Sequence, residues 1–236
     1  MIAEGMVDAG CEVIISARKV EQVEAAAEKL SAKGRCIGVP ADLSTDAGIA
    51  HLVTEVSDRW DGLEILCNNA GASWGEPLDD FPAGGWDKVM NVNVRTVFFL
   101  TQSLLPLLRA AGSADSPSRV INTGSVDGLT PPDWPTFSYS SSKAAVHMLT
   151  RHLAKTLASD HITVNAIAPG PFDSQMMAFV LDDPESRRAI ATDVPLGRIG
   201  TPDDMAGVAI YLASQAGSFM TGAIVPVSGG LATIYR

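Results

Sequence analysis

Short apolar segments alternate with longer amphipathic segments along the 236-residue chain. The apolar segments are nearly continuous, which is typical of strands that are covered on both faces of a sheet. Strands are expected at Glu12–Ser16, Arg35–Pro40, Leu63–Asn68, Arg119–Thr123, Thr163–Ala168 and Ala223–Val227. Helices are expected at Val20–Lys33, Thr45–Trp60, Trp86–Ala111, Tyr139–Ser159 and Asp203–Ser214. This alternation predicts right-handed βαβ units and an α/β fold with a doubly wound, Rossmann-like parallel sheet.

Capping residues and a proline predict where individual helices begin and end. Ser44 or Thr45 is expected to cap the second helix, and Thr201-Pro202-Asp203-Asp204 is a typical helix start. Pro106 is expected to kink or end the long central helix, because proline lacks the backbone N–H. No linker-like stretch or internal repeat divides the sequence, so we expect one domain over residues 1–236.

The net charge of the sequence limits the classes of macromolecule that it can bind. A net charge of −10 argues against nucleic acid or an anionic membrane surface. Three scattered cysteines fit a reducing compartment, and neither cysteines nor histidines have the spacing of metal ligands. No apolar run has membrane-spanning length, and the acidic N-terminus is unlike a signal peptide. We therefore expect a cytoplasmic protein without a metal site.

Small and polar residues follow five of the expected strands. In open α/β sheets, ligands bind beyond the carboxyl ends of the strands. The segments there are Ser16-Ala17-Arg18, Ala41-Asp42-Leu43, Asn68-Asn69-Ala70-Gly71, Thr123-Gly124-Ser125 and Ala168-Pro169-Gly170. Each alone is an ordinary turn, but together they favour a flat ligand lying against the backbone.

Tyr139 and Lys143 stand four residues apart, on one face of an expected helix. A nearby ammonium favours the phenolate, so we expect Lys143 to lower the pKa of Tyr139. A tyrosine of this kind can exchange a proton with a carbonyl or alcohol oxygen near neutral pH. Taken alone, the pair is also typical of a solvated helix face.

The ordered motifs Asn68-Asn69-Ala70-Gly71, Asn93, Ser125, Tyr139-x-x-x-Lys143 and Pro169-Gly170 resemble those of the short-chain dehydrogenase/reductase family. The resemblance extends from the first residue to Ser228-Gly229-Gly230. Three segments are most similar to β-ketoacyl reductases of the rhamnolipid-synthesis type; they are Gly71–Gly75, Ile167–Phe172 and Phe219–Gly222.

This resemblance implies roles for four catalytic residues. Tyr139 is expected to be the general acid in ketone reduction, or the base in alcohol oxidation. Lys143 would lower its pKa and bind the nicotinamide ribose, while Ser125 would hold the substrate oxygen. Asn93 would anchor a water linked to Lys143; a purely structural role for this asparagine is the alternative.

The resemblance also implies a dinucleotide site. Its expected residues are Asp42 and Leu43 at the adenine, Asn69, Ala70 and Gly71 at the adenosine ribose, and Pro169, Gly170 and Phe172 near the nicotinamide. Arg18 stands where an acid would bind the 2′-hydroxyl of NAD, so NADP with its 2′-phosphate is favoured over NAD. The alternative is a solvated arginine at a helix entrance.

The sequence departs from the family at its start. Members open with a strand and a glycine-rich turn, whereas Met1–Gly5 corresponds to the helix that follows that turn. The first strand is therefore expected to be absent between Glu12–Ser16 and Leu63–Asn68. Either the natural gene product is longer, which we favour, or a short chain binds cofactor poorly. Asp127 and Ser228 also depart from the pattern, and neither is expected to touch the catalytic set.

The function predicted from these features is NADP-dependent reduction of a ketone, of 3-oxoacyl type, to a secondary alcohol. A lid is expected at about 173–195, with Met176, Met177, Phe179 and Val180 suited to an acyl substrate or simply packed on the sheet. The alternatives are a cofactor-defective binding or scaffold protein, and a sugar, polyol or steroid alcohol dehydrogenase. The family resemblance further implies a homodimer or homotetramer formed through the long helices at 86–111 and 139–159.

Overall fold

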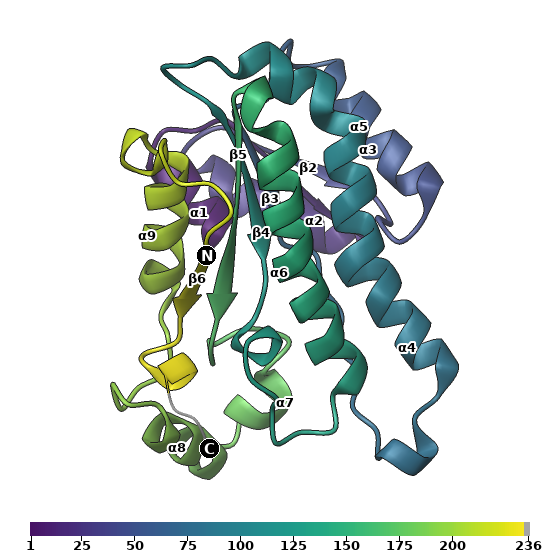
Figure 1. Cartoon of the computed structure of the whole chain (residues 1–236), viewed down its shortest axis with the longest axis vertical. Helices are drawn as coiled ribbons and strands as arrows, with labels where there is room; N and C mark the ends of the chain where they lie inside the picture. Colours follow the sequence, from purple (N-terminus) through teal and green to yellow (C-terminus); the bar gives the residue numbers. More distant parts are fainter. Residues whose placement is uncertain (234–236) are drawn as a thin grey trace.

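The fold is α/β and Rossmann-like, as predicted, in a computed structural model that describes residues 1–233 (Figure 1). Residues 234–236 of the expected domain lie outside the described part. The strands are β1 (Val13–Ala17), β2 (Cys36–Pro40), β3 (Ile65–Asn68), β4 (Ser118–Thr123), β5 (Ile162–Pro169) and β6 (Ile224–Val227). The helices are α1 (Ile2–Asp8), α2 (Val20–Ser31), α3 (Asp46–Ser57), α4 (Ala83–Met90), α5 (Thr96–Ala111), α6 (Phe137–Leu157), α7 (Ala178–Leu181), α8 (Pro184–Asp193) and α9 (Pro202–Ala213).

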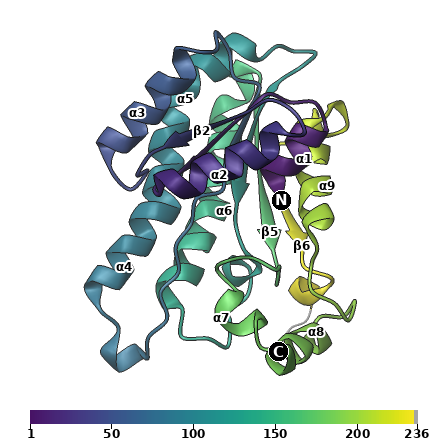
Figure 2. The same cartoon turned by 180° about the vertical axis from the view of Figure 1, so that it is seen from behind.

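Helices cover both faces of the strands; β4 and β5 are buried almost throughout, whereas β1 and β6 are only partly buried. One apolar core joins α3, α5 and α6 to the sheet through residues such as Leu52, Leu104 and Leu157. On the other face, Met6 of α1 packs with Met205 of α9, while α2 covers β1 and β2 (Figure 2). The two-sided cover explains why the strand sequences read as continuous apolar runs. Within the described residues, no helix is both long and apolar enough to cross a membrane.

All strand pairs are parallel, but the strands form two separate sheets. β1 pairs with β2, and β3, β4, β5 and β6 pair in that order. No pairing joins β1 to β3 among residues 1–233, which agrees with the strand expected to be absent there. Val13, Ile15, Ile65 and Leu66 line a cavity between these two strands. The carboxyl ends of β4, β5 and β6 point to the same end of the molecule (Figure 1).

The long central helix differs from its prediction. It consists of α4 and α5 joined by a π-helical turn at Asn91–Arg95. Pro106 was expected to kink or end the helix. It does not end the helix, because α5 continues to Ala111. Leu104 and Leu108 on either side of Pro106 are buried in the core, and this packing holds the helix together despite the missing N–H.

Helix caps follow the sequence more closely. Thr45, rather than Ser44, caps α3 by accepting a hydrogen bond from the Gly48 N–H at 3.0 Å. Thr201 and Asp204 form a reciprocal capping box at the start of α9, as that segment predicts. Helices α7 and α8 lie in the expected lid region, where no helix was predicted, and Asp183 caps α8.

Candidate active site

The carboxyl ends of the strands border one cavity of about 2820 Å³. It continues into the gap between β1 and β3, which makes it larger than an ordinary small-molecule site of about 300–1,000 Å³. The predicted site residues on its wall are Arg18, Leu43, Asn69, Ala70, Gly71, Ser125, Tyr139, Lys143, Pro169, Gly170 and Phe172. Asn93 lies behind this wall, and Asp42 lies beside it rather than on it. The structure thus gathers most of the predicted set in one place.

Tyr139 and Lys143 project from the first turns of α6 into this cavity. The Lys143 side chain is only 4% exposed, and its Nζ donates a hydrogen bond to the Thr123 carbonyl at 2.8 Å. The same Nζ lies 5.4 Å from the centroid of the Tyr139 ring. Thr123 ends β4, so the amine is held between the sheet and the phenol.

Burial controls the pKa values of this pair. It raises the pKa of Tyr139 to about 12, although hydrogen bonding with the Ser125 side chain acts in the opposite direction and the charge of Asp127 adds to the rise. Burial likewise lowers the pKa of Lys143 to about 8. The expected lowering of the pKa of Tyr139 is therefore wrong for this structure, because loss of solvation raises this pKa. At neutral pH the phenol holds its proton.

Asn93 occupies the π-helical turn between α4 and α5 and is 1% exposed. Its Oδ1 accepts a hydrogen bond from the Ala72 N–H at 2.7 Å. Its Nδ2 donates to the Ala72 carbonyl and to the Ser142 Oγ, both at 2.9 Å. Ser142 in turn donates to the Tyr139 carbonyl at 2.7 Å. Asn93 thus ties the loop after β3 to α6, which supports the structural alternative; the anchoring of a water stays a prediction.

Replacing Asn93 with alanine is expected to lower the free energy of unfolding by about 2–4 kcal/mol, because two half-buried backbone groups of Ala72 and the buried Ser142 hydroxyl each lose a hydrogen bond. Urea unfolding followed by circular dichroism measures this loss. Asn69→Ala is the matched control, since Asn69 is exposed and accepts only one hydrogen bond, from Thr123 Oγ1 at 3.0 Å. Equal losses for the two variants would contradict the structural role of Asn93.

The expected wall of the dinucleotide site is open above the Lys143 amine. A Cβ added at Gly71 would lie 3.6 Å from Asn93 Oδ1 and 3.8 Å from Lys143 Nζ, so the Gly71 backbone lies close to both side chains. Gly170 is more tightly constrained, because an added Cβ would lie 2.9 Å from the Ser228 Cβ. Phe172 is buried and packs against Gly200, which fixes the backbone beyond β5.

Arg18 is exposed at the carboxyl end of β1 and lines the cavity. Asp42, which follows β2, accepts hydrogen bonds from the Ser44 N–H at 3.1 Å and from the Ser44 hydroxyl at 2.7 Å. These hydrogen bonds lower the pKa of Asp42, and the charge of Arg18 contributes further. Asp42 therefore stabilises the turn before α3 and lies within the field of Arg18.

Two site residues were missed from the sequence. The expectation that Asp127 does not touch the catalytic set is wrong: its backbone N–H donates to the Ser125 Oγ at 3.1 Å. His147 lies beneath the same turn, where its Nε2 accepts a long hydrogen bond from the Ser125 N–H at 3.5 Å. A Cβ at Gly124 would lie 2.2 Å from that Nε2, so glycine is required there. The spacing of His147 four residues after Lys143, on the same helix face, was the available signal.

The mouth of the cavity is apolar and aromatic. Met176, Met177 and Phe179 line it from the expected lid, and Val180 is not among the lining residues. The Phe179 ring contacts the Trp134 ring edge to face, with 5.5 Å between centroids. An ion pair between Asp173 and Arg187 joins the start of the lid to α8.

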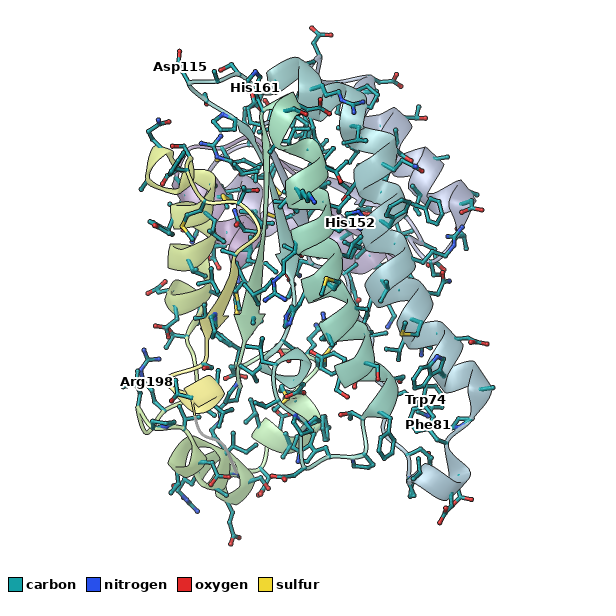
Figure 3. All side chains as sticks on the ribbon, viewed as in Figure 1. Trp74, Phe81, Asp115, His152, His161 and Arg198 are labelled. Atoms are coloured by element: carbon teal, nitrogen blue, oxygen red, sulfur yellow. The ribbon has the colours of Figure 1, made fainter. Side chains whose placement is uncertain are left out.

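Figure 3 orients the site within the molecule. Trp74 and Phe81 lie at the end where α4 begins, whereas Asp115 and His161 lie at the opposite end, before β4 and β5. Trp74 comes three residues after Gly71, and its ring packs on Gly85 of α4. Loops that leave the carboxyl edge line one end of the cavity, and His161 is not among the lining residues.

Comparisons with known proteins agree with this geometry. Residues 1–232 match the family described as enoyl-(acyl carrier protein) reductase. The chain is 47% identical to the rhamnolipids biosynthesis 3-oxoacyl-[acyl-carrier-protein] reductase of Pseudomonas aeruginosa, over 98% of this chain and 90% of that protein. It is 35% identical to the 2-dehydro-3-deoxy-D-gluconate 5-dehydrogenase of Dickeya dadantii, over 97% and 88%. The solved Pseudomonas aeruginosa RhlG/NADP active-site complex superimposes with a TM-score of 0.95 at 47% identity, covering 98% of this chain and 90% of that one.

Proposed function

The chain belongs to the short-chain dehydrogenase/reductase family of oxidoreductases, and on this premise we propose that it reduces a ketone to a secondary alcohol with NADPH. The proposed substrate is of the 3-oxoacyl type. The observation that carries the proposal is the convergence of Ser125, Tyr139 and Lys143 on one cavity that also reaches Arg18. Purified chain should consume NADPH, followed by its absorbance, when a 3-oxoacyl thioester is added. No consumption despite NADPH binding would contradict the proposal.

Each residue has a distinct task in this mechanism. Tyr139 gives its phenolic proton to the ketone oxygen, and the Ser125 hydroxyl holds that oxygen in place. The Lys143 ammonium, fixed by Thr123, would stabilise the phenolate that remains and would hold a ribose hydroxyl of the cofactor. Asn93 keeps the loop after β3 against α6. NADPH supplies the hydride when bound.

Several features of the chain fit NADP. Gly71 and Lys143 line the cavity together, which suits a ligand next to the Lys143 amine. Arg18 offers a guanidinium to a 2′-phosphate at the far end of the same cavity, which favours NADP over NAD. The 47% identical structure was solved as an NADP complex, which supports the same choice.

NADPH affinity is expected to fall as the pH rises through about 8. Burial lowers the pKa of Lys143 to about that value, so the ammonium loses its proton there rather than near 10.5. Above this pH the lysine no longer provides a charged donor for the ribose. Titrations of NADPH by tryptophan fluorescence between pH 6.5 and 9.5 measure the effect, with Lys143→Met as the pH-insensitive control. A wild-type affinity that is constant over this range would contradict the role.

The apolar mouth formed by Met176, Met177, Phe179 and Trp134 supports an acyl substrate. A sugar-acid dehydrogenase is among the relatives, so reduction of a polyol-type or sugar substrate is the alternative function within the enzyme class. The open gap between β1 and β3 favours the other alternative, a binding protein that is defective in cofactor use. Saturable micromolar NADPH binding would exclude the latter.

A homodimer or homotetramer is also proposed. Phe98 and Phe99 on α5 and Met148 on α6 are exposed, with 62% of Met148 accessible. Such residues on two long helices fit an interface between copies of the chain. Light scattering on the purified protein measures the oligomeric state, and a monomer at micromolar concentration would contradict this assignment.

A further inference from the structure

Asp127 is an unexplained acid in the wall of the active-site cavity. It is half-buried and stands two residues after Ser125, whose Oγ accepts its backbone N–H at 3.1 Å. Its carboxylate has no hydrogen bond or ion pair within residues 1–233. The neighbouring aspartates of the wall differ, because Asp173 pairs with Arg187, and Asp133 and Asp193 have interactions of their own. Asp127 is therefore left to face whatever occupies the cavity.

Asp127 lines the same cavity wall as Ser125, Tyr139 and Lys143. Its negative charge raises the pKa of both Tyr139 and Lys143, and the Lys143 charge acts back on Asp127. Burial raises the pKa of Asp127 itself, which shows that it lies in a weakly solvated place. A substrate whose ketone oxygen contacts Ser125 and Tyr139 therefore enters the field of the Asp127 carboxylate.

The charge of Lys143 acts on Asp127, but no ion pair joins the two side chains in the described part of the chain. Lys143 is turned to the Thr123 carbonyl. The other cations of the wall are Arg18 at the end of β1, Arg59 in an ion pair with Glu55, and Lys88 over the Trp74 ring. A carboxylate next to the substrate ketone would thus meet a like charge in a poorly solvated site, which is a strongly unfavourable arrangement.

We propose that Asp127 is a specificity-determining residue that excludes substrates bearing a carboxylate beside the ketone, so that the site takes uncharged 3-oxo compounds such as esters and thioesters. This inference rests on the proposed ketone reduction and deepens it. It separates two substrate types that share one reacting group, because a free 3-oxo acid and its ester differ in charge at the position that Asp127 faces. Rejection by an unpaired charge is a common source of specificity.

The test compares ethyl acetoacetate with acetoacetate, which contain the same ketone. The measured quantity is the ratio of kcat/KM for the ester to kcat/KM for the acid. A changed pKa of Tyr139 or Lys143 alters kcat/KM for both compounds, so its effect cancels in this ratio. Asp127→Asn removes the charge at nearly constant volume, and we expect it to reduce this ratio by about 10- to 100-fold. Asp127→Ala, which removes the charge without adding an amide, is expected to reduce the ratio in the same direction.

Asp79→Asn is the matched control. Asp79 is exposed in the turn at Leu78–Asp80, outside the cavity wall, and the substitution changes the net charge by the same amount. Its ratio should equal that of the wild type. Two results would overturn the inference if the wild-type enzyme reduces the ester. One is an unchanged ratio in Asp127→Asn and Asp127→Ala, and the other is that neither variant reduces either compound. Reduction of neither compound by the wild type would overturn the proposed function, and this inference with it.

Discussion

Tyr139→Phe is expected to lower kcat for ketone reduction by about 10²- to 10⁴-fold, the range for loss of a positioned general acid. Phenylalanine keeps the ring that packs beside Lys143 Nζ, so the change removes the proton donor and little else. Because burial raises the pKa of Tyr139 to about 12, the wild-type phenol is protonated at neutral pH and ready to act as an acid. Steady-state NADPH oxidation with a 3-oxo ester measures the loss.

Two controls separate chemistry from binding and folding. NADPH should bind Tyr139→Phe with nearly unchanged affinity, since the hydroxyl is assigned to the ketone oxygen. Tyr211→Phe removes a hydroxyl from an exposed tyrosine on α9 and should leave kcat unchanged. Activity of Tyr139→Phe within a few-fold of the wild type would contradict the assignment of the acid.

Arg18→Glu is expected to reverse the cofactor preference, with a change of about 10²- to 10³-fold in the ratio of kcat/KM for NADPH to that for NADH. The phosphate loses a charge-assisted hydrogen bond and meets a like charge, while the new carboxylate can accept from the 2′-hydroxyl of NADH. Arg18 is exposed and lines the cavity, so the exchange should disturb little packing.

Lys29→Glu provides the matched control for Arg18. Lys29 is exposed in the last turn of α2, and the substitution makes the same change in net charge away from the cavity wall. Its cofactor ratio should equal that of the wild type. If Arg18→Glu also leaves the ratio unchanged, Arg18 is a solvated arginine at a helix entrance and the NADP assignment loses its structural basis.

The strands were predictable because burial on both faces leaves a plain mark in the sequence. The continuous apolar runs around Val120 and Val164 are strands with no exposed face, and Thr201 and Asp204 carry their capping box within four residues. Local chemistry decides such features. The gathering of Asn69, Ser125 and Gly170 at one edge also follows, since parallel strands end on the same side.

Other features depend on contacts between distant segments and could not be read locally. The π-helical turn at Asn91–Arg95 places Asn93 on the Ala72 backbone, and no periodicity in that stretch indicates it. The pKa of Tyr139 was predicted in the wrong direction because its burial arises from tertiary packing. The contact of Asp127 with the site was missed for the same reason, because the turn at Val126–Gly128 places this residue on the cavity wall.

The most direct test of the central claim follows a deuterium atom from the nicotinamide ring of NADPH into the product. With a 3-oxo ester as substrate, mass spectrometry should find one deuterium on the alcohol carbon for the wild type, and formation of this product should slow by about 10²-fold or more in Tyr139→Phe. Absence of labelled alcohol from a chain that binds NADPH, or labelled alcohol formed by Tyr139→Phe at the wild-type rate, would contradict the account.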